Sequence, residues 1–430
     1  MKTVRLNEET KKDLLNSLLK RSPNSYVQYE EKVAQIIADV RERGDSAVFD
    51  YTRQFDKWEI SKDNIRVSKK EIDEAYASMD KEFIRVMEHS AKNISDFHRK
   101  QLSNSWIDTK SDGTVLGQKI LPIAISGVYV PGGKAAYPSS VLMNIIPAKV
   151  AGVKRIIMTT PAGEDGKVNP GTLVAARIAG VEEIYKVGGA QAIAAMAFGT
   201  QSIPKADKIT GPGNIFVALA KKACFGYVSI DSIAGPSEIL VLADETANPR
   251  YVAADLLSQA EHDELASAIL ITTDALLAEA VEQEIEGFLQ TLSRADIIRK
   301  SLEQYGYILL ANSMEDAVSA ANAIASEHLE ILTKDPYDVM TRIENAGAIF
   351  LGPYSSEPLG DYYAGPNHIL PTNGTARFFS PLCVDDFLKK SSIISYSKDA
   401  LEKVHEDIEL FAKKEGLTAH ANSIHVRFEE

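Results

Sequence analysis

Apolar residues recur at helical spacing along the first hundred residues of the chain. Positions such as Val33 and Ile36 lie on the spacing of one helix face. The pattern predicts a short amphipathic helix over residues 7–21 and longer helices over 27–56 and 70–101. Because these segments carry many charges and few strand-like runs, we expect them to form an outer helical layer.

From about residue 117, short apolar runs alternate with alanine-rich helical stretches. Apolar strands separated by helices are typical of parallel sheets covered on both faces. Nine strands are many for one sheet, so two α/β lobes are expected. After residue 385 the pattern turns back to helix, with a long candidate at 398–415, and this tail is predicted to be a small separate unit. The predicted strands are 120–130, 155–160, 182–188, 207–210, 238–244, 268–273, 307–312, 330–333 and 348–352.

Composition narrows the class of protein. The chain has 430 residues, 45% of them hydrophobic, which is enough for two or three domains. Its charge of −13 repels phosphate backbones, so nucleic acid is not an expected partner. No window is apolar enough to span a membrane, and the start lacks a signal-peptide core. Two cysteines are too few for a thiolate metal cage. Because membrane-spanning and signal segments are lacking, we expect a cytoplasmic protein.

Two short segments carry residues suited to metal and proton chemistry. In LLSQAEHDE, Gln259 and His262 lie three residues apart and could share one metal ion, although a surface polar cluster is the simpler alternative. In ASEHLEIL, Glu327 and His328 suit general acid–base work, because both can titrate near neutral pH. Charge compensation at a helix end is the alternative for this pair.

Three further segments invite functional interpretation. The long polar loop 359–377 contains an Asp and a His and favours function over disorder. The segment 415–423, taken alone, is typical of a solvated tail. GPGN at 211–214 resembles the start of a dinucleotide fingerprint, with Asp231 downstream, but Phe216 stands where the third glycine belongs. Helix capping remains the alternative there, and Cys224 is interpreted as a buried structural cysteine.

Taken together, these stretches resemble the histidinol dehydrogenase family over nearly the whole chain. The shared motifs, in order, are VRERGDSAVFDYTRQFD, FHRKQ, GVYVPGG, KVGGAQAIAAMAFGT, TGPGNIFVALAK, IDSIAGPSEI, LLSQAEHD, ASEHLEI, GDYYAGPNHILPT and GLTAHA. The resemblance implies oxidation of L-histidinol to L-histidine through histidinaldehyde, with one Zn²⁺ per subunit and two NAD⁺, as the last step of histidine biosynthesis.

The resemblance also implies roles for individual residues. Glu327 and His328 would form the acid–base pair. The zinc ligands would be Gln259, His262, Asp361 and His420, and these residues and His328 would also surround the substrate. Further substrate contacts would come from Ser237, His368 and Glu415, and NAD contacts from Tyr129, Gln191 and Asn214.

The family fold implied is α/β, with two large Rossmann-like lobes, one inserted in the other, and small N- and C-terminal helical units. The expected segments are a helical 1–24, a first domain of 25–128 and 239–384, an inserted NAD-binding domain of 129–238, and a tail of 385–430 exchanged between the subunits of a homodimer. A zinc hydrolase and a non-enzymatic binder of histidinol or metal are the competing hypotheses.

Overall fold

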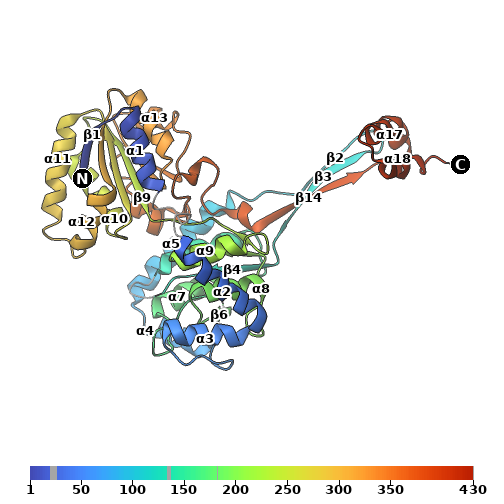
Figure 1. Cartoon of the computed structure of the whole chain (residues 1–430), viewed down its shortest axis with the longest axis horizontal. Helices are drawn as coiled ribbons and strands as arrows, with labels where there is room; N and C mark the ends of the chain where they lie inside the picture. The colour runs from blue at the N-terminus through green and yellow to red at the C-terminus, as the bar shows by residue number, and fades with distance from the viewer. Residues whose placement is uncertain (20–26, 133–136, 182, 430) are drawn as a thin grey trace. The chain divides into compact units, whose positions relative to one another are not determined.

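The computed structural model describes residues 1–19, 27–132, 137–181 and 183–429 (Figure 1). The chain divides into two compact units. Unit 1 comprises Met1–Gln101 and Ile123–Phe387, and unit 2 comprises Leu102–Pro122 and Leu388–Glu430. Among the described residues, every helix is too short or too polar to cross a lipid bilayer.

Unit 1 contains a six-stranded parallel sheet with the order β1-β11-β10-β9-β12-β13. Its central strands are continuous apolar runs because helices cover both faces. The strands are β1 (Lys2–Arg5), β9 (Glu238–Ala243), β10 (Ser267–Thr272), β11 (Gly306–Leu310), β12 (His328–Leu332) and β13 (Ala348–Leu351).

Alternate residues of this sheet enter different cores. Ile239 and Val241 pack with helices α10 (Pro249–Ala260), α11 (Ala275–Phe288) and α12 (Ala295–Tyr305). Leu240 and Leu242 pack on the other face, with α1 (Glu8–Leu19) and α13 (Met314–Ile324) (Figure 1). The period-two alternation of a strand therefore places one helical layer on each side.

A second, five-stranded parallel sheet in unit 1 has the order β6-β5-β4-β7-β8. The chain builds it from the centre to one edge and then from the centre to the other, so the order reverses between β4 and β7. The strands are β4 (Ile125–Tyr129), β5 (Arg155–Thr159), β6 (Glu183–Tyr185), β7 (Lys208–Thr210) and β8 (Ser229–Ile230). The connecting helices are α6 (Pro138–Val150), α7 (Pro170–Ala179), α8 (Gly189–Phe198) and α9 (Ile215–Cys224).

The N-terminal helices form the outer layer expected from the sequence. Helix α2 contacts α8 and α9, α4 contacts α7, and α5 contacts α6 and α7. The helix predicted over 27–56 is two helices, because Gly44 adopts a left-handed conformation with φ of 58° between them. These helices are α2 (Val27–Arg43), α3 (Asp45–Asp56), α4 (Lys69–Ser78) and α5 (Lys81–Arg99).

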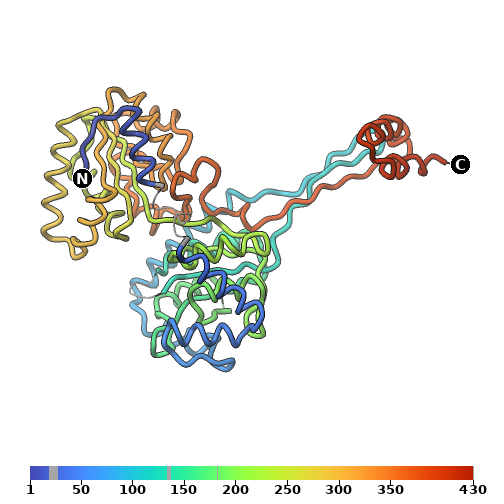
Figure 2. Tube along the Cα trace, viewed as in Figure 1, coloured from blue at the N-terminus to red at the C-terminus, as the bar shows by residue number. Residues whose placement is uncertain are grey.

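Unit 2 consists of a three-stranded antiparallel sheet and a short helical end. The sheet has the order β14-β3-β2, and residues far apart in the sequence run side by side in it (Figure 2). Its strands are β2 (Trp106–Thr109), β3 (Val115–Pro122) and β14 (Leu388–Ser395), and its helices are α16 (Lys398–Glu402), α17 (His405–Lys414) and α18 (Thr418–His425).

Eight of the nine predicted strands overlap β5–β7 and β9–β13, with ends that differ by up to three residues. The predicted strand 120–130 is wrong as one element: Asp207 accepts hydrogen bonds from the amides of Ala124 and Ile125, each at 2.9 Å, and the chain breaks there into β3 and β4. The tail begins with β14 rather than helix, because pairing with β3 overrides its polar composition. Strands β1, β2 and β8 were not predicted, and residues 20–24, within the predicted N-terminal segment, lie outside the described residues.

Gly44 gives a test of the α2–α3 junction. A Cβ at this position would meet the Gln201 amide, which accepts a hydrogen bond from the Asp45 N–H at 2.8 Å. Gly44→Ala should therefore lower the free energy of unfolding by about 1–2 kcal/mol, measured by urea denaturation. Gly287 in α11 has open space around its Cβ position, so Gly287→Ala should raise that free energy by about 0.5 kcal/mol. Equal effects of the two changes would contradict this account.

Candidate active site

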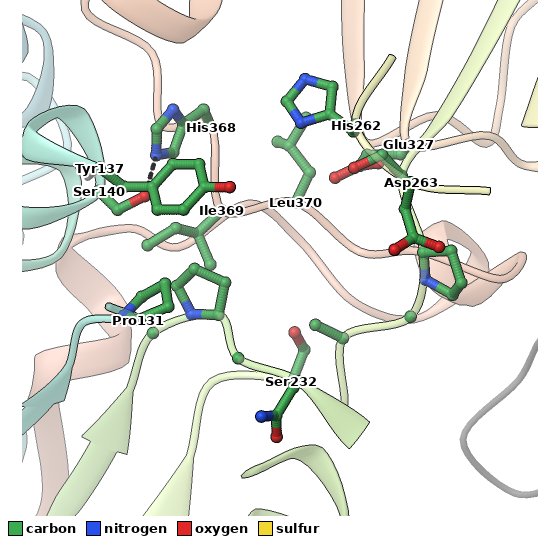
Figure 3. Close-up of a pocket in the computed structure, with 18 of the residues that line it drawn as sticks. Pro131, Tyr137, Ser140, Ser232, His262, Asp263, Glu327, His368, Ile369 and Leu370 are labelled. Carbon is green, nitrogen blue, oxygen red and sulfur yellow. Dashed lines mark hydrogen bonds between the residues drawn. The ribbon is translucent and has the colours of Figure 1, made fainter. Parts of the chain in front are cut away.

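A cavity of about 610 Å³ in unit 1 collects most of the site residues expected from the sequence. In Figure 3, His262 and Glu327 lie on one side of it, and His368 lies on the other, beside Tyr137 and Ser140. Ser140 and the Nε2 atom of His368 are 3.3 Å apart. The expected residues that line the cavity are Asn214, Ser237, Gln259, His262, Glu327, His328, Asp361 and His368.

The two sheets contribute opposite edges to this cavity. Pro131 and the turn Gly211–Asn214 follow the carboxyl ends of β4 and β7, where the strand order of the smaller sheet reverses. Open α/β sheets bind ligands at such a reversal. Ser237 and Glu327, by contrast, precede β9 and β12 and lie at the amino edge of the larger sheet. The site is thus assembled from both sheets.

The expected acid–base pair is held by one residue of β9. The N–H of Glu238 donates to Glu327 Oε2 at 2.9 Å, and the Nδ1–H of His328 donates to the carbonyl of Glu238 at 2.9 Å. The parallel pairing of His328 with Ile239 sets this alignment. Because Nδ1 is engaged with a carbonyl, Nε2 is the ring atom left to exchange a proton.

Burial and neighbouring charges shift the pKa values of Glu327, His328 and Asp361. Burial raises the pKa of Glu327 to about 8. Burial disfavours the charged form of His328, but the carboxylates of Glu327 and Asp361 outweigh it and raise its pKa to about 10. The Nε2 atom of His328 lies 3.8 Å from Asp361 Oδ1. Despite its own burial, Asp361 has a pKa lowered to about 2 by His328 and His368.

Gln259, His262 and Asp361 offer the donor set for a divalent cation. Gln259 is 1% exposed, and neither atom of its amide has a hydrogen-bond partner. A buried amide without partners is costly unless a ligand satisfies it. Helix α10 ends at Ala260, so His262 lies just past the helix, where its amide bonds the Gln259 carbonyl. Partial desolvation lowers the pKa of His262, which favours the neutral ring that binds metals.

Glu357 is a buried carboxylate near His328 and Asp361 that the sequence patterns did not indicate. It lies in the short helix α15 (Glu357–Leu359), is 2% exposed, and accepts a hydrogen bond from Ser258 at 2.9 Å. Possible ligand atoms of His328, Glu357 and Asp361 lie within 4.8 Å of one another. This compact group shares only Asp361 with the expected zinc ligands. Its position four residues before Asp361 was the signal available in the sequence.

Two expected residues, Glu415 and His420, belong to unit 2. Glu415 follows α17 and His420 lies in α18, and both are exposed to solvent. Neither is among the described residues that line the cavity in unit 1.

The expected cofactor residues fall into two places. Asn214 lines the cavity and caps α9 through hydrogen bonds from Phe216 and Val217. Tyr129 and Gln191 instead surround the start of α8 and are not among the described cavity-lining residues. The Tyr129 hydroxyl accepts from the Gly189 N–H at 3.2 Å.

A buried amide marks the second of these places. Gln191 is 1% exposed, and both of its amide atoms lack a hydrogen-bond partner. As at Gln259, a ligand would relieve this cost.

Comparison with known proteins identifies the family. The model of the family described as histidinol dehydrogenase matches residues 19–428. The chain belongs to the histidinol dehydrogenase family. It is 56% identical to the histidinol dehydrogenase of Halalkalibacterium halodurans, with 100% of both chains covered. It is also 56% identical to that of Bacillus subtilis strain 168, over 95% of this chain and 96% of the relative.

A solved structure agrees with this assignment. The crystal structure of histidinol dehydrogenase from Elizabethkingia anophelis matches 99% of this chain and 98% of its own, at a TM-score of 0.93 and 39% identity. The resemblance inferred from the motifs is therefore confirmed, as is a mixed α/β fold with parallel sheets. The family is one of oxidoreductases.

Asp56, beside Tyr129, gives a pH-dependent test. Burial raises the pKa of this carboxyl to about 6, although the Gly188 N–H opposes the shift. A raised pKa in the folded state means that ionisation of Asp56 disfavours folding. The protonated carboxyl carries no such cost, so the fold is more stable below pH 4 and loses this stability as the pH rises through 6. Asp56→Asn should therefore raise the free energy of unfolding by about 1–2 kcal/mol at pH 8 and leave it nearly unchanged near pH 4.

Urea denaturation at the two pH values measures this difference. Asp63→Asn, at an exposed carboxylate of the same unit, serves as the control and should leave the pH dependence unchanged. A pH-independent effect of Asp56→Asn would show that the Asp56 carboxyl does not titrate as described.

Proposed function

We propose that this chain oxidises L-histidinol to L-histidine through histidinaldehyde, using two NAD⁺ and one zinc ion per subunit, as the last step of histidine biosynthesis. The observation that carries the proposal is the joint anchoring of Glu327 and His328 on Glu238, beside Asp361 in a single cavity. Membership of the histidinol dehydrogenase family is the reason for proposing histidinol as the substrate.

His328 is the base for the first oxidation. Its Nδ1 is fixed by the Glu238 carbonyl, so Nε2 receives the proton of the substrate hydroxyl. The ring must be neutral to do so. The charges of Glu327 and Asp361 hold a proton on it, and loss of either charge releases that proton more easily. Bound NAD⁺ would supply the acceptor for the hydride that leaves the hydroxyl-bearing carbon.

The second oxidation proceeds without a cysteine nucleophile. Cys224 is buried, and burial raises its pKa to about 12; burial also raises the pKa of Cys383. Neither is among the described residues that line the cavity. Water must therefore add to the aldehyde to give a hydrate that can lose a second hydride. Glu327, anchored beside His328, takes a proton from that water.

The proposed metal ligands are Gln259, His262 and Asp361, completed by His420 of the partner subunit. The unsatisfied Gln259 amide and the ionised Asp361 fit a divalent cation. Zinc would orient the imidazole and amine of the substrate. Ser237, His368 and Glu415 would contact the substrate around it.

The proposed NAD site involves Tyr129, Gln191 and Asn214. The smaller sheet supports it, because its strand order reverses between β4 and β7 and its glycine-rich turn joins a strand to a helix. In this proposal both lobes are incomplete dinucleotide-binding folds, and segment 129–238 is the inserted one.

Unit 2 supports the proposed homodimer. Large apolar side chains are exposed on both of its parts, including Trp106, Ile394, Leu410 and Phe411. Protein–protein interfaces bury exposed aromatic and aliphatic side chains of this kind. We propose that unit 2 docks on a second copy of the chain and brings Glu415 and His420 to the partner's cavity.

The direct test is NADH absorbance with histidinol, NAD⁺ and zinc. Oxidation of an alcohol to an acid removes two hydrides, so about two NADH should form per histidinol. A zinc hydrolase or a non-enzymatic binder would form none. Absence of NADH, together with a zinc-free protein by elemental analysis, would refute the proposal.

A variant of His328 can distinguish a catalytic role from a role as a metal ligand. His328→Ala should lower turnover by at least about a hundredfold while one zinc per chain is retained, because His328 is a base and not a ligand. Activity assays and elemental analysis measure the two effects. Asp361→Asn is the matched control and should lose zinc. Loss of zinc from His328→Ala would mean that the roles are misassigned.

The shared site can be tested by complementation. A chain with His420→Ala and a chain with His328→Ala should each be inactive as homodimers. When the two are co-expressed with different tags and hybrids are purified through both tags, one of the two sites regains both residues. The hybrid should then show about half of the wild-type activity. A hybrid as inactive as its parents would place His420 in its own chain's site.

A further inference from the structure

A buried ion pair contacts the glycine-rich turn of the smaller sheet. Lys221 of α9 and Asp231, which follows β8, form an ion pair with side chains 2% and 4% exposed. Lys221 Nζ also donates to the Gly211 carbonyl at 3.0 Å, and the Gly211 N–H donates to Asp231 Oδ2 at 2.8 Å. The pair thus holds both polar backbone groups of Gly211.

Gly211 has little freedom to move within this arrangement. Its φ is 118°, a conformation open mainly to glycine, and a Cβ there would meet the carbonyl of Tyr129 at the end of β4. The turn is consequently fixed between the end of β4 on one side and the ion pair on the other. Asn214, three residues later, caps α9 and faces the cavity.

Stability alone does not account for such a pair. Buried ion pairs contribute little net stability compared with well-packed apolar residues of similar size, because both charges lose their hydration. The pair instead fixes the orientation of one residue. Lys221 donates to the carbonyl of Gly211, and Asp231 accepts from its N–H. The turn that it fixes lines the cavity through Gly211, Pro212, Gly213 and Asn214.

We infer that Lys221 and Asp231 are positioning residues for dinucleotide binding, acting through the Gly211–Asn214 turn. The inference rests on the proposed NAD-dependent activity. It also reassigns Asp231. In a standard fingerprint an acidic residue at this distance binds the cofactor ribose, but here the Asp231 carboxylate is committed to Lys221 and to the Gly211 N–H. Asp231 also lines the cavity, but with its side chain 4% exposed and both interactions directed at the turn, it acts on the cofactor by holding Gly211 and not as a ribose ligand.

The test compares the Michaelis constants for NAD⁺ and histidinol in the zinc-loaded, full-length enzyme. Lys221→Met and Asp231→Asn should raise the KM for NAD⁺ by roughly tenfold to a hundredfold, with little change in the KM for histidinol, because a small misplacement of the turn affects only the cofactor. Calorimetric titration of NAD⁺ should show the same loss of affinity.

A double variant separates positioning from folding. Lys221→Met leaves Asp231 buried without its partner and can unfold the chain, whereas Lys221→Met combined with Asp231→Leu removes both charges and should recover the thermal midpoint. The raised KM for NAD⁺ should persist in the double variant, since neither side chain can bond Gly211.

The control is another buried lysine pair outside the turn. Lys208 in β7 is paired with Asp386 at 2.9 Å, and its side chain is 8% exposed. Lys208→Met should lower the thermal midpoint without changing the KM for NAD⁺. Neither residue is among the described cavity-lining residues.

The outcomes separate this inference from the proposed function. If the wild type forms NADH and the folded double variant keeps its KM for NAD⁺ within about twofold, or both Michaelis constants rise equally, the positioning role is overturned. If the wild type neither binds NAD⁺ nor forms NADH, the proposed function fails and this inference fails with it.

Discussion

The peptide groups of Glu238 are the constraint on which the site depends. One N–H and one carbonyl of this residue hold the two side chains of the acid–base pair. The arrangement requires that β12 pair with β9 in its observed register, which sets Glu327 and His328 beside the start of β9. Shifting that register by one residue would turn His328, the first residue of β12, to the opposite face of the sheet and away from the Glu238 carbonyl. The chemistry is thus set by the alignment of two buried parallel strands.

Charge is distributed around this anchor so that each group has a distinct protonation state. Burial raises the pKa of Glu327 to about 8, so this carboxyl can both release and accept a proton near neutral pH, whereas the pKa of Asp361, beside His328 and His368, is lowered to about 2. Pairs of titratable groups whose environments separate their pKa values are the usual basis of acid–base assignments. Beside these ionisable groups, Gln259 offers an uncharged amide that has no hydrogen-bond partner and could bind a metal ion.

The position of the site explains why both lobes are needed. The larger sheet presents the acid–base pair from its amino edge, an unusual place for an α/β site. The smaller sheet presents the glycine-rich turn from its carboxyl edge, at the reversal of its strand order. Neither edge alone supplies both groups of residues, so the cavity depends on the packing of unit 1 as a whole.

Sequence patterns predicted most of the parallel strands, because short continuous apolar runs such as β9 and β10 are typical of strands buried on both faces. They failed where pairing partners decide the outcome: β14 is largely polar and exposed, and it forms a strand only because β3 lies beside it. Eight of the residues expected from the ordered motifs line one cavity. It did not reveal Glu357 or the Lys221–Asp231 pair, since burial and hydrogen bonding, not residue type, give these groups their importance.

The most direct measurement of the central claim is anomalous diffraction at the zinc absorption edge from crystals of the zinc-loaded protein. We expect one peak per chain, about 2.0–2.2 Å from ligand atoms of Gln259, His262, Asp361 and His420 of the partner subunit, with His328 Nε2 left uncoordinated. A peak centred on His328, Glu357 and Asp361, the compact group that the structure also offers, would contradict it. In that case His328 would be a ligand and could not serve as the base.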